Sequence, residues 1–202
     1  MGFAPPTASP RRLSTARRSP VAAAKRDSKQ FARVIAYHAR VLISLSGLPG
    51  TGKSTVAKLA AAELAAVYLR IDSIEQPMFT AGFAVEGVGY EVAQAVAVDN
   101  LTIGLTVIAD CVDRWPLTRD AWREAARRAG VRVLEVEFVC SDVDEHRRRV
   151  DARHAADPRW PSWREVVDRD YRPWQREHLA IDSARLPVES AAAQLVTAAR
   201  ST

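Results

Sequence analysis

One glycine-rich segment carries the strongest chemical signal in the sequence. It reads Gly47-Leu48-Pro49-Gly50-Thr51-Gly52-Lys53-Ser54, followed by Thr55, and it matches the pattern G-x-x-x-x-G-K-[ST] in full. Glycine residues let backbone N–H groups converge on phosphate oxygens without interference from Cβ atoms. The amino group of Lys53 can reach the β- and γ-phosphates, and the hydroxyl of Ser54 is a ligand for Mg²⁺. Residues 47–55 are therefore predicted to bind a nucleoside triphosphate together with Mg²⁺.

The sequence on either side of this segment supports that prediction. Residues 41–45 are apolar and partly β-branched, which predicts a buried parallel strand. Residues 53–66 place Val56, Leu59 and Leu64 at helical spacing, which predicts a helix. A chance glycine turn before a helix is the competing interpretation, and the strand, the full motif and the helix together disfavour it.

The remaining chain alternates between predicted strands and helices. Further strands are expected at 67–71, 101–109, 131–139 and 179–181, and helices at 89–100, 118–129, 142–154, 162–171 and from 187 onward. Segment 73–88 is apolar but irregular, which predicts a short helix and a loop. This alternation predicts an α/β fold of three layers, with about five mostly parallel strands between helices. Ligands of such folds bind outside the carboxyl ends of the strands.

Charge and composition exclude several classes of protein. The formal net charge is +5, yet residues 1–26 hold six bases and no acid, so residues 27–202 hold 23 bases against 24 acids. A nucleic-acid track needs a basic stripe, which argues against a nucleic-acid partner for residues 27–202. The longest uncharged run, 41–52, is too short to span a membrane. Cys111 and Cys140 lack C-x-x-C spacing and are predicted to be reduced thiols in a cytoplasmic protein.

Residues 41–202 resemble the small P-loop kinases, the group that includes gluconate, shikimate, nucleoside monophosphate and chloramphenicol kinases. The resemblance rests on GLPGTGKST at 47–55, LRID at 69–72, VIAD at 107–110 and CSDVDEHRRRVDAR at 140–153. It implies the P-loop NTPase fold, ATP as the phosphoryl donor and a helical lid at about 147–165. We expect residues 1–27 to be a disordered basic tail, residues 28–39 to include a short leading helix, and residues 28–202 to form the kinase-like domain.

Asp72 ends the second predicted strand. The resemblance implies that an acid at this position faces the acceptor hydroxyl. Phosphoryl transfer needs an acid that orients or deprotonates the nucleophile, so Asp72 is a candidate catalytic residue. A helix N-cap is the competing interpretation, because Ser73 and Glu75 follow.

Two acids follow the third predicted strand. The resemblance implies that Asp110 is a Walker B-like acid, which acts on Mg²⁺ directly or through water. Asp113 is the alternative, and either acid could instead cap a turn. Arg114 and Arg119 lie in the same predicted loop, where they could bind an anionic or polar substrate or remain solvated.

Four arginines follow the fourth predicted strand, and similar kinases carry such residues on a lid. Arg149 and Arg153 are i,i+4 neighbours and share a helix face, so we predict that they close over ATP as catalytic residues. Arg147 and Arg148 point elsewhere, and Arg147 is the weaker third candidate. The alternative is a solvated basic helix whose arginines pair with acids of the same segment.

These observations predict an ATP-dependent kinase that transfers the γ-phosphoryl group to a hydroxyl of a small molecule. Segment 73–100, with Phe79, Phe83 and Tyr90, is expected to shape the acceptor pocket, and its apolar character favours a neutral acceptor. One alternative is a toxin-type or polynucleotide-end kinase. Another is a nucleotide-binding ATPase or switch protein, although the sequence lacks N-K-x-D and has no D-x-x-G after the third predicted strand.

Overall fold

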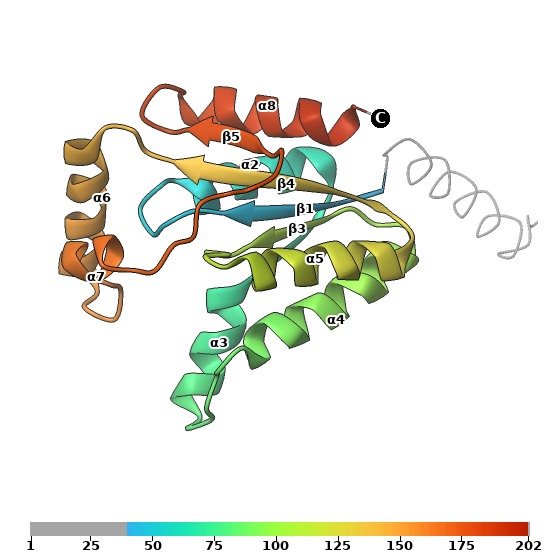
Figure 1. The fold of residues 1–202 in the computed structure, drawn as a ribbon, viewed down its shortest axis with the longest axis horizontal. Coiled ribbons are helices and arrows are strands. Elements are labelled where there is room, and N and C mark those ends of the chain that lie inside the picture. Colours follow the sequence, from blue (N-terminus) through green and yellow to red (C-terminus); the bar gives the residue numbers. More distant parts are fainter. Residues whose placement is uncertain (1–39, 202) are drawn as a thin grey trace, which may run out of the picture. The chain divides into compact units, whose positions relative to one another are not determined.

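Five parallel strands form a single sheet in the computed structural model, which describes residues 40–201 (Figure 1). Their order across the sheet is β2-β3-β1-β4-β5, and every neighbouring pair is parallel. The strands are β1 (Val41–Ser46), β2 (Val67–Arg70), β3 (Val107–Asp110), β4 (Arg132–Val139) and β5 (Leu179–Asp182). The α/β class and the parallel sheet predicted from the alternation are confirmed. The tail predicted at 1–27 and the helix predicted within 28–39 lie outside the described residues.

Helices cover both faces of the sheet and its carboxyl edge. They are α2 (Lys53–Leu64), α3 (Ile71–Thr80), α4 (Val88–Thr102), α5 (Pro116–Ala129), α6 (Val143–Ala156), α7 (Trp163–Val167) and α8 (Val188–Arg200). Helices α2 and α8 pack on one face, and α4 and α5 pack on the other (Figure 1). Helices α6 and α7 stand beyond the carboxyl ends of the strands, where the lid was expected. No helix within residues 40–201 is long and apolar enough to cross a membrane.

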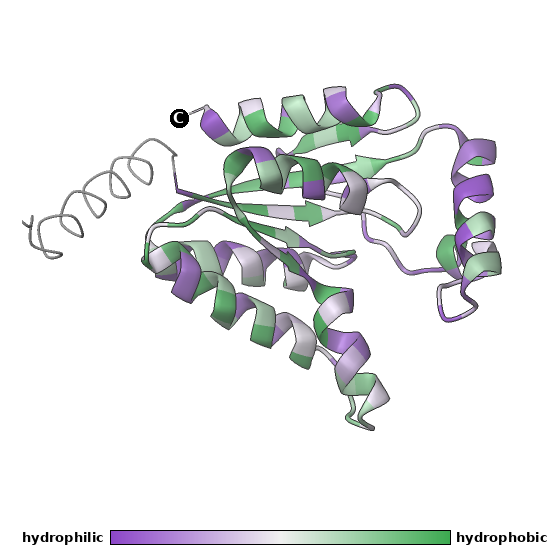
Figure 2. Cartoon of the chain, turned by 180° about the vertical axis from the view of Figure 1, so that it is seen from behind, coloured by the Kyte–Doolittle hydropathy of each residue, from purple (hydrophilic) through white to green (hydrophobic). Residues whose placement is uncertain are grey.

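The alternating side chains of β1 build two apolar cores. Val41, Ile43 and Leu45 pack toward α2 and α8, whereas Leu42 packs toward α4 and α5. All six residues of β1 are buried, as expected for a strand with helices on both of its faces. Figure 2 shows this apolar character along the strands, in contrast to the hydrophilic surface of α6. The phosphate-binding segment therefore follows a strand that is buried along its whole length.

The predicted strand at 101–109 is wrong in its first half. Leu101 instead completes the buried face of α4, in register with Ala93 and Ala97. The helix ends in a turn in which Gly104 donates its N–H to the carbonyl of Leu101 at 3.0 Å and adopts a φ of +101°. The strand starts only at Val107. Helix α7 is also shorter than predicted, ending at Val167, and the chain then runs irregularly to β5.

Candidate active site

The segment between β1 and α2 has the backbone conformation of a phosphate-binding loop. Gly50 and Gly52 adopt φ angles of +86° and +81°, which L side chains rarely adopt. A Cβ on Gly50 would also lie only 2.5 Å from Cγ2 of Val150 on α6. Helix α2 begins directly at Lys53, so its free N–H groups and positive dipole end face the same space. Glycine is therefore required at position 50, both by the backbone conformation and by the close approach of α6.

Lys53 is a buried cation at the start of α2. Its Nζ donates to the carbonyl of Leu48 at 3.2 Å. Burial lowers the pKa of Lys53, and the charges of Asp110 and Asp72 act in the opposite direction. A phosphate in the adjacent cavity would supply the counter-charge that this buried ammonium lacks.

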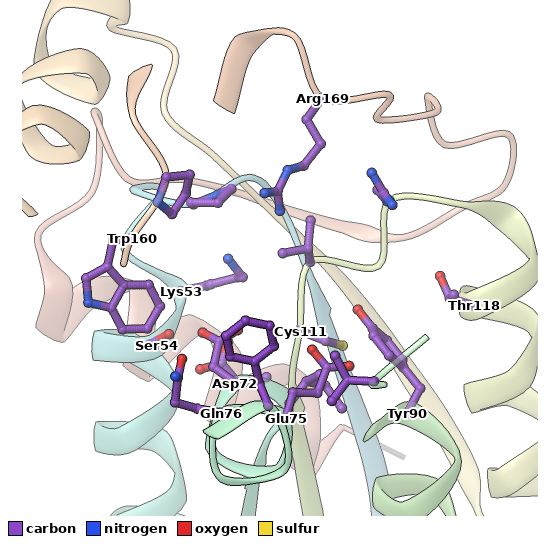
Figure 3. A pocket seen from close by; sticks show the side chains of 18 of the residues that line it. Lys53, Ser54, Asp72, Glu75, Gln76, Tyr90, Cys111, Thr118, Trp160 and Arg169 are labelled. Carbon is purple, nitrogen blue, oxygen red and sulfur yellow. The ribbon is translucent and has the colours of Figure 1, made fainter. Parts of the chain in front are cut away.

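A cavity of about 520 Å³ opens beside Lys53 (Figure 3). The phosphate-binding loop, α3, the start of α4, the β3–α5 loop and the lid all contribute to its wall. Its lining residues are Pro49, Lys53, Ser54, Ile71, Asp72, Glu75, Gln76, Phe79, Val85, Gly87, Tyr90, Asp110, Cys111, Val112, Arg114, Trp115, Thr118, Arg153, Arg159, Trp160, Pro161 and Arg169. The structure thus brings six of the predicted site residues to one space, namely Pro49, Lys53, Ser54, Asp72, Asp110 and Arg153.

Asp110 is held at the cavity wall by β2. Its side chain is 2% exposed, and Oδ2 accepts a hydrogen bond from the hydroxyl of Tyr68 at 2.5 Å. Arg70 Nε lies 3.9 Å from the same oxygen. Burial and the hydrogen bond to Asp110 raise the pKa of Tyr68, so the phenol remains a donor. Ser54 lies within reach of the same phenol, so the two predicted metal ligands are close together.

Asp113, the alternative metal ligand, does not line the cavity. Its Oδ2 accepts a hydrogen bond from the hydroxyl of Ser44 on β1 at 3.0 Å, and the residue is 1% exposed. Burial raises the pKa of Asp113 to about 6, although hydrogen bonds from Cys111 and Ser44 oppose the shift. The geometry therefore favours Asp110 over Asp113 as the acid that faces a nucleotide.

The buried position of Asp113 leads to a prediction about pH and stability. Its pKa of about 6 exceeds the ordinary value of 3.8, so the folded state binds its proton more tightly than the unfolded state does. This group consequently lowers the free energy of unfolding as pH rises from about 4 through about 6. Asparagine does not titrate, so Asp113→Asn should gain stability relative to the wild type by about 1.4 kcal/mol between pH 5 and pH 8.

Urea denaturation at both pH values measures this difference. Asp99→Asn, which removes an exposed acid of α4, is the control and should show little change with pH. An equal stability difference between Asp113→Asn and the wild type at pH 5 and pH 8 would contradict the assignment.

Asp72 lies at the cavity in the first turn of α3. Its Oδ2 accepts a hydrogen bond from Nη2 of Arg70 at 2.6 Å, and 49% of its side chain is exposed. The N-cap position of α3 is occupied by Arg70, and no side chain caps the helix. The helix N-cap interpretation of Asp72 is therefore not supported, and the carboxylate is available to the cavity.

Helix α6 and the loop that follows it contact the phosphate-binding loop and β2 through aromatic and histidine side chains. The guanidinium of Arg153 lies 3.5 Å from the ring centre of Trp160, and that of Arg70 lies 5.3 Å from it. His146, on α6, contacts the carbonyl oxygen of Pro49 through Nε2 at 2.8 Å. No sequence motif identifies His146 as part of the site, because this contact joins residues 97 positions apart in the sequence.

The structure does not bring Arg149 to the same cavity as Arg153. Arg149 donates to Glu145 Oε1 at 2.7 Å and to the hydroxyl of Ser183 at 2.9 Å. It lines a second cavity of about 230 Å³, together with Gly52 and Thr55 on the other side of the loop. Arg147 is exposed and pairs with an acid one turn further along α6.

The two arginines that follow β3 differ in role, and Arg119 lies on α5 instead of in the predicted loop. Arg119 is 2% exposed and donates to the carbonyl oxygens of Asp113 and Arg172, so it supports the chain internally. Arg114 lines the cavity, as does Arg169, which no motif in the sequence identified. Segment 73–100, whose apolar character favours a neutral acceptor, forms only part of the cavity wall, and Glu75 and cations from later segments add charge to it. Phe79 also lines the cavity, whereas Phe83 does not.

A parallel sheet with a glycine-rich loop after β1 and a helical lid beyond the strand ends is a P-loop kinase-like fold. A family model described as an AAA domain matches residues 42–169, so the chain belongs to this family. A comparison with curated protein sequences found no match.

Several solved kinases share the fold. The APS kinase CysC of Mycobacterium tuberculosis, solved with AMPPNP and APS, is 19% identical with a TM-score of 0.64, covering 81% of this chain and 99% of that one. A gluconokinase from Sinorhizobium meliloti is 17% identical with a TM-score of 0.53, covering 81% and 90% respectively. A sugar kinase from Janibacter sp. is 16% identical with a TM-score of 0.56, covering 79% and 93%.

Proposed function

We propose that the protein is an ATP-dependent, Mg²⁺-dependent kinase that transfers the γ-phosphoryl group to a hydroxyl of a small molecule. One observation carries the proposal. A buried lysine of the phosphate-binding loop, the carboxylates of Asp72 and Asp110 and the guanidinium of Arg153 border one cavity. Lysine and arginine suit the phosphates, and the two carboxylates suit a metal and an acceptor hydroxyl.

The residues present fit a nucleotide with its metal. The glycines of the loop adopt positive φ angles, which expose backbone N–H groups to an anion. Ser54 and Asp110 are oxygen donors close to each other, and both contacts of Asp110 involve Oδ2, which leaves Oδ1 for the metal or its water. Mg²⁺, when bound, supplies charge neutralisation at the β- and γ-phosphates.

The protein side chains would have separate roles in stabilising charge, orienting the acceptor and excluding water. Lys53 and Arg153 would stabilise the negative charge that spreads over the transferred phosphoryl group. Asp72, oriented by Arg70 at 2.6 Å, would accept a hydrogen bond from the acceptor hydroxyl and align it for attack. Trp160 would exclude water from the reacting groups, because cation–π contacts with Arg153 and Arg70 position its ring at the cavity wall.

The second cavity provides space for the other end of the nucleotide. It adjoins the loop at Gly52 and Thr55, and its wall includes the guanidinium of Arg149 and the Ser183 turn. We propose that the ribose or base binds there. In this arrangement Arg149 contacts the donor nucleotide, and Arg153 contacts the phosphoryl group that is transferred.

A product assay tests the proposed reaction. The full chain is incubated with ATP, Mg²⁺ and a panel of sugars, sugar acids, nucleosides, nucleotides and hydroxylated antibiotics, and mass spectrometry detects any gain of one phosphoryl group. We expect a phosphorylated small molecule and stoichiometric ADP. Hydrolysis of ATP that no panel member stimulates would favour the ATPase alternative, and phosphorylation of an oligonucleotide end alone would favour the polynucleotide-end alternative.

A further inference from the structure

Two arginines face the cavity from segments that are far apart in the sequence. Arg114 follows β3, Arg169 follows α7, and both line the cavity wall. In Figure 3, Arg169 projects into the cavity from the side opposite Asp72 and Glu75. Burial and the positive charge of Arg114 lower the pKa of Arg169.

Arg169 lies between two aspartates in the sequence but is not neutralised by them. Asp168 pairs with Arg164 at 3.4 Å, and Asp170 pairs with Arg172 at 2.9 Å. Among residues 40–201, no carboxylate lies within 4.0 Å of the Arg169 guanidinium. The charges of Asp72 and Glu165 act on the pKa of Arg169 from further away. Arg169 therefore lines the cavity without a direct ion-pair partner among the described residues.

Interactions outside the cavity hold these two arginines in place. The N–H of Arg172 donates to the carbonyl oxygen of Arg114 at 2.8 Å, and Nε1 of Trp115 donates to Asp170 Oδ2 at 3.2 Å. The buried Arg119 donates to the carbonyl oxygen of Arg172 at 2.7 Å. Because these bonds connect both chain segments, two like charges are preorganised at the wall of one cavity, which favours the binding of an anion there.

The cationic pair comes from different segments than the cations of the phosphoryl-transfer end. Arg114 follows β3 and Arg169 follows α7, whereas Lys53 begins α2 and Arg153 lies on α6. Asp72, proposed to bind the acceptor hydroxyl, lines the same cavity as all four cations.

We propose that the acceptor carries an anionic group, such as a carboxylate, a sulfate or a phosphate, which binds between Arg114 and Arg169. This inference rests on the proposed kinase function and specifies its substrate class. The anionic group anchors one end of the acceptor and a hydroxyl of the same molecule reaches Asp72. Uncharged sugars and nucleosides leave both guanidinium groups without a partner, so they bind more weakly.

Inorganic sulfate serves as the first probe, because it requires no knowledge of the acceptor. Thermal unfolding of the full chain is followed with saturating AMPPNP and Mg²⁺, while sulfate replaces chloride at constant ionic strength. Wild type, Arg169→Ala and Arg164→Ala are compared. Arg164 is the matched control, because its side chain is 90% exposed and it does not line the cavity. Loss of one charge-assisted contact should weaken the apparent sulfate affinity of Arg169→Ala on the order of 10- to 100-fold, and Arg164→Ala should match the wild type.

Matched acceptor pairs serve as the second probe: D-gluconate with D-glucitol, D-glycerate with glycerol, and adenosine 5′-phosphate with adenosine. In each pair that is phosphorylated, we expect the acid to have the lower KM, and Arg169→Ala should raise that KM while the KM for ATP stays within a few-fold. An equal sulfate response in all three proteins, or preference for the neutral member of a pair, would overturn the inference. Weakened AMPPNP binding by Arg169→Ala would assign the pair to the nucleotide instead. Failure of AMPPNP to stabilise even the wild type would count against the kinase function itself.

Discussion

Lys53→Ala is expected to lower the rate of phosphoryl transfer by on the order of 10³-fold, because the variant lacks the buried cation that faces the cavity. The fold should persist. Burial lowers the pKa of Lys53 in the protein without ligand, which means that its charge is costly to the folded state, so its removal should not lower the melting temperature. Steady-state kinetics and thermal unfolding of the purified variant measure both effects.

Lys58→Ala is the matched control for this prediction. Lys58 lies on the same helix, α2, but is exposed and does not line the cavity. The control should retain wild-type turnover and nucleotide affinity. Turnover of Lys53→Ala at the wild-type level would contradict the assignment of residues 47–55 as the phosphate-binding loop.

Asp72→Asn is expected to lower kcat by about 10²- to 10⁴-fold, since an amide orients the acceptor hydroxyl poorly and cannot take its proton. The KM for ATP should change only a few-fold, because the role proposed for Asp72 is at the acceptor hydroxyl and not at the nucleotide. Stability should also change little, because the Arg70–Asp72 ion pair is half exposed on the aspartate side and such pairs contribute about 1 kcal/mol or less.

Asp99→Asn controls for the loss of a carboxylate from the surface. Asp99 is exposed on α4 and should be replaceable without a change in kcat. If Asp72→Asn instead lowered the melting temperature and left kcat intact, Asp72 would be a structural residue of α3.

The sequence predicts the sheet well because β1 and β3 carry clear physical signals. Residues of β1 are uncharged and mostly apolar, and the glycine motif indicates where the strand must end. The start of β3 was predicted too early because Leu101 is equally compatible with a strand and with the buried face of an amphipathic helix. The helical alternative is favoured by its spacing from Ala93 and Ala97, which places all three side chains in the core.

Some residues of the candidate site could be predicted from the local sequence, whereas others are positioned only by long-range contacts. Lys53, Asp72 and Asp110 each follow directly after a predicted strand or motif, and parallel strands end at one edge of a sheet. Arg169 follows no such element, and its approach to Arg114 depends on hydrogen bonds between chain segments more than 50 residues apart in the sequence. The separation of Arg149 from Arg153 also required the structure, since i,i+4 spacing does not specify which cavity each long side chain enters.

A crystal structure of the full chain with AMPPNP and Mg²⁺ tests the central claim most directly. We expect the β- and γ-phosphates to contact the backbone N–H groups of residues 50–54 and the amino group of Lys53. The metal should lie next to the hydroxyl of Ser54, on the side that faces Asp110. Nucleotide bound elsewhere on the protein, or a glycine-rich loop that remains empty at saturating AMPPNP, would contradict it.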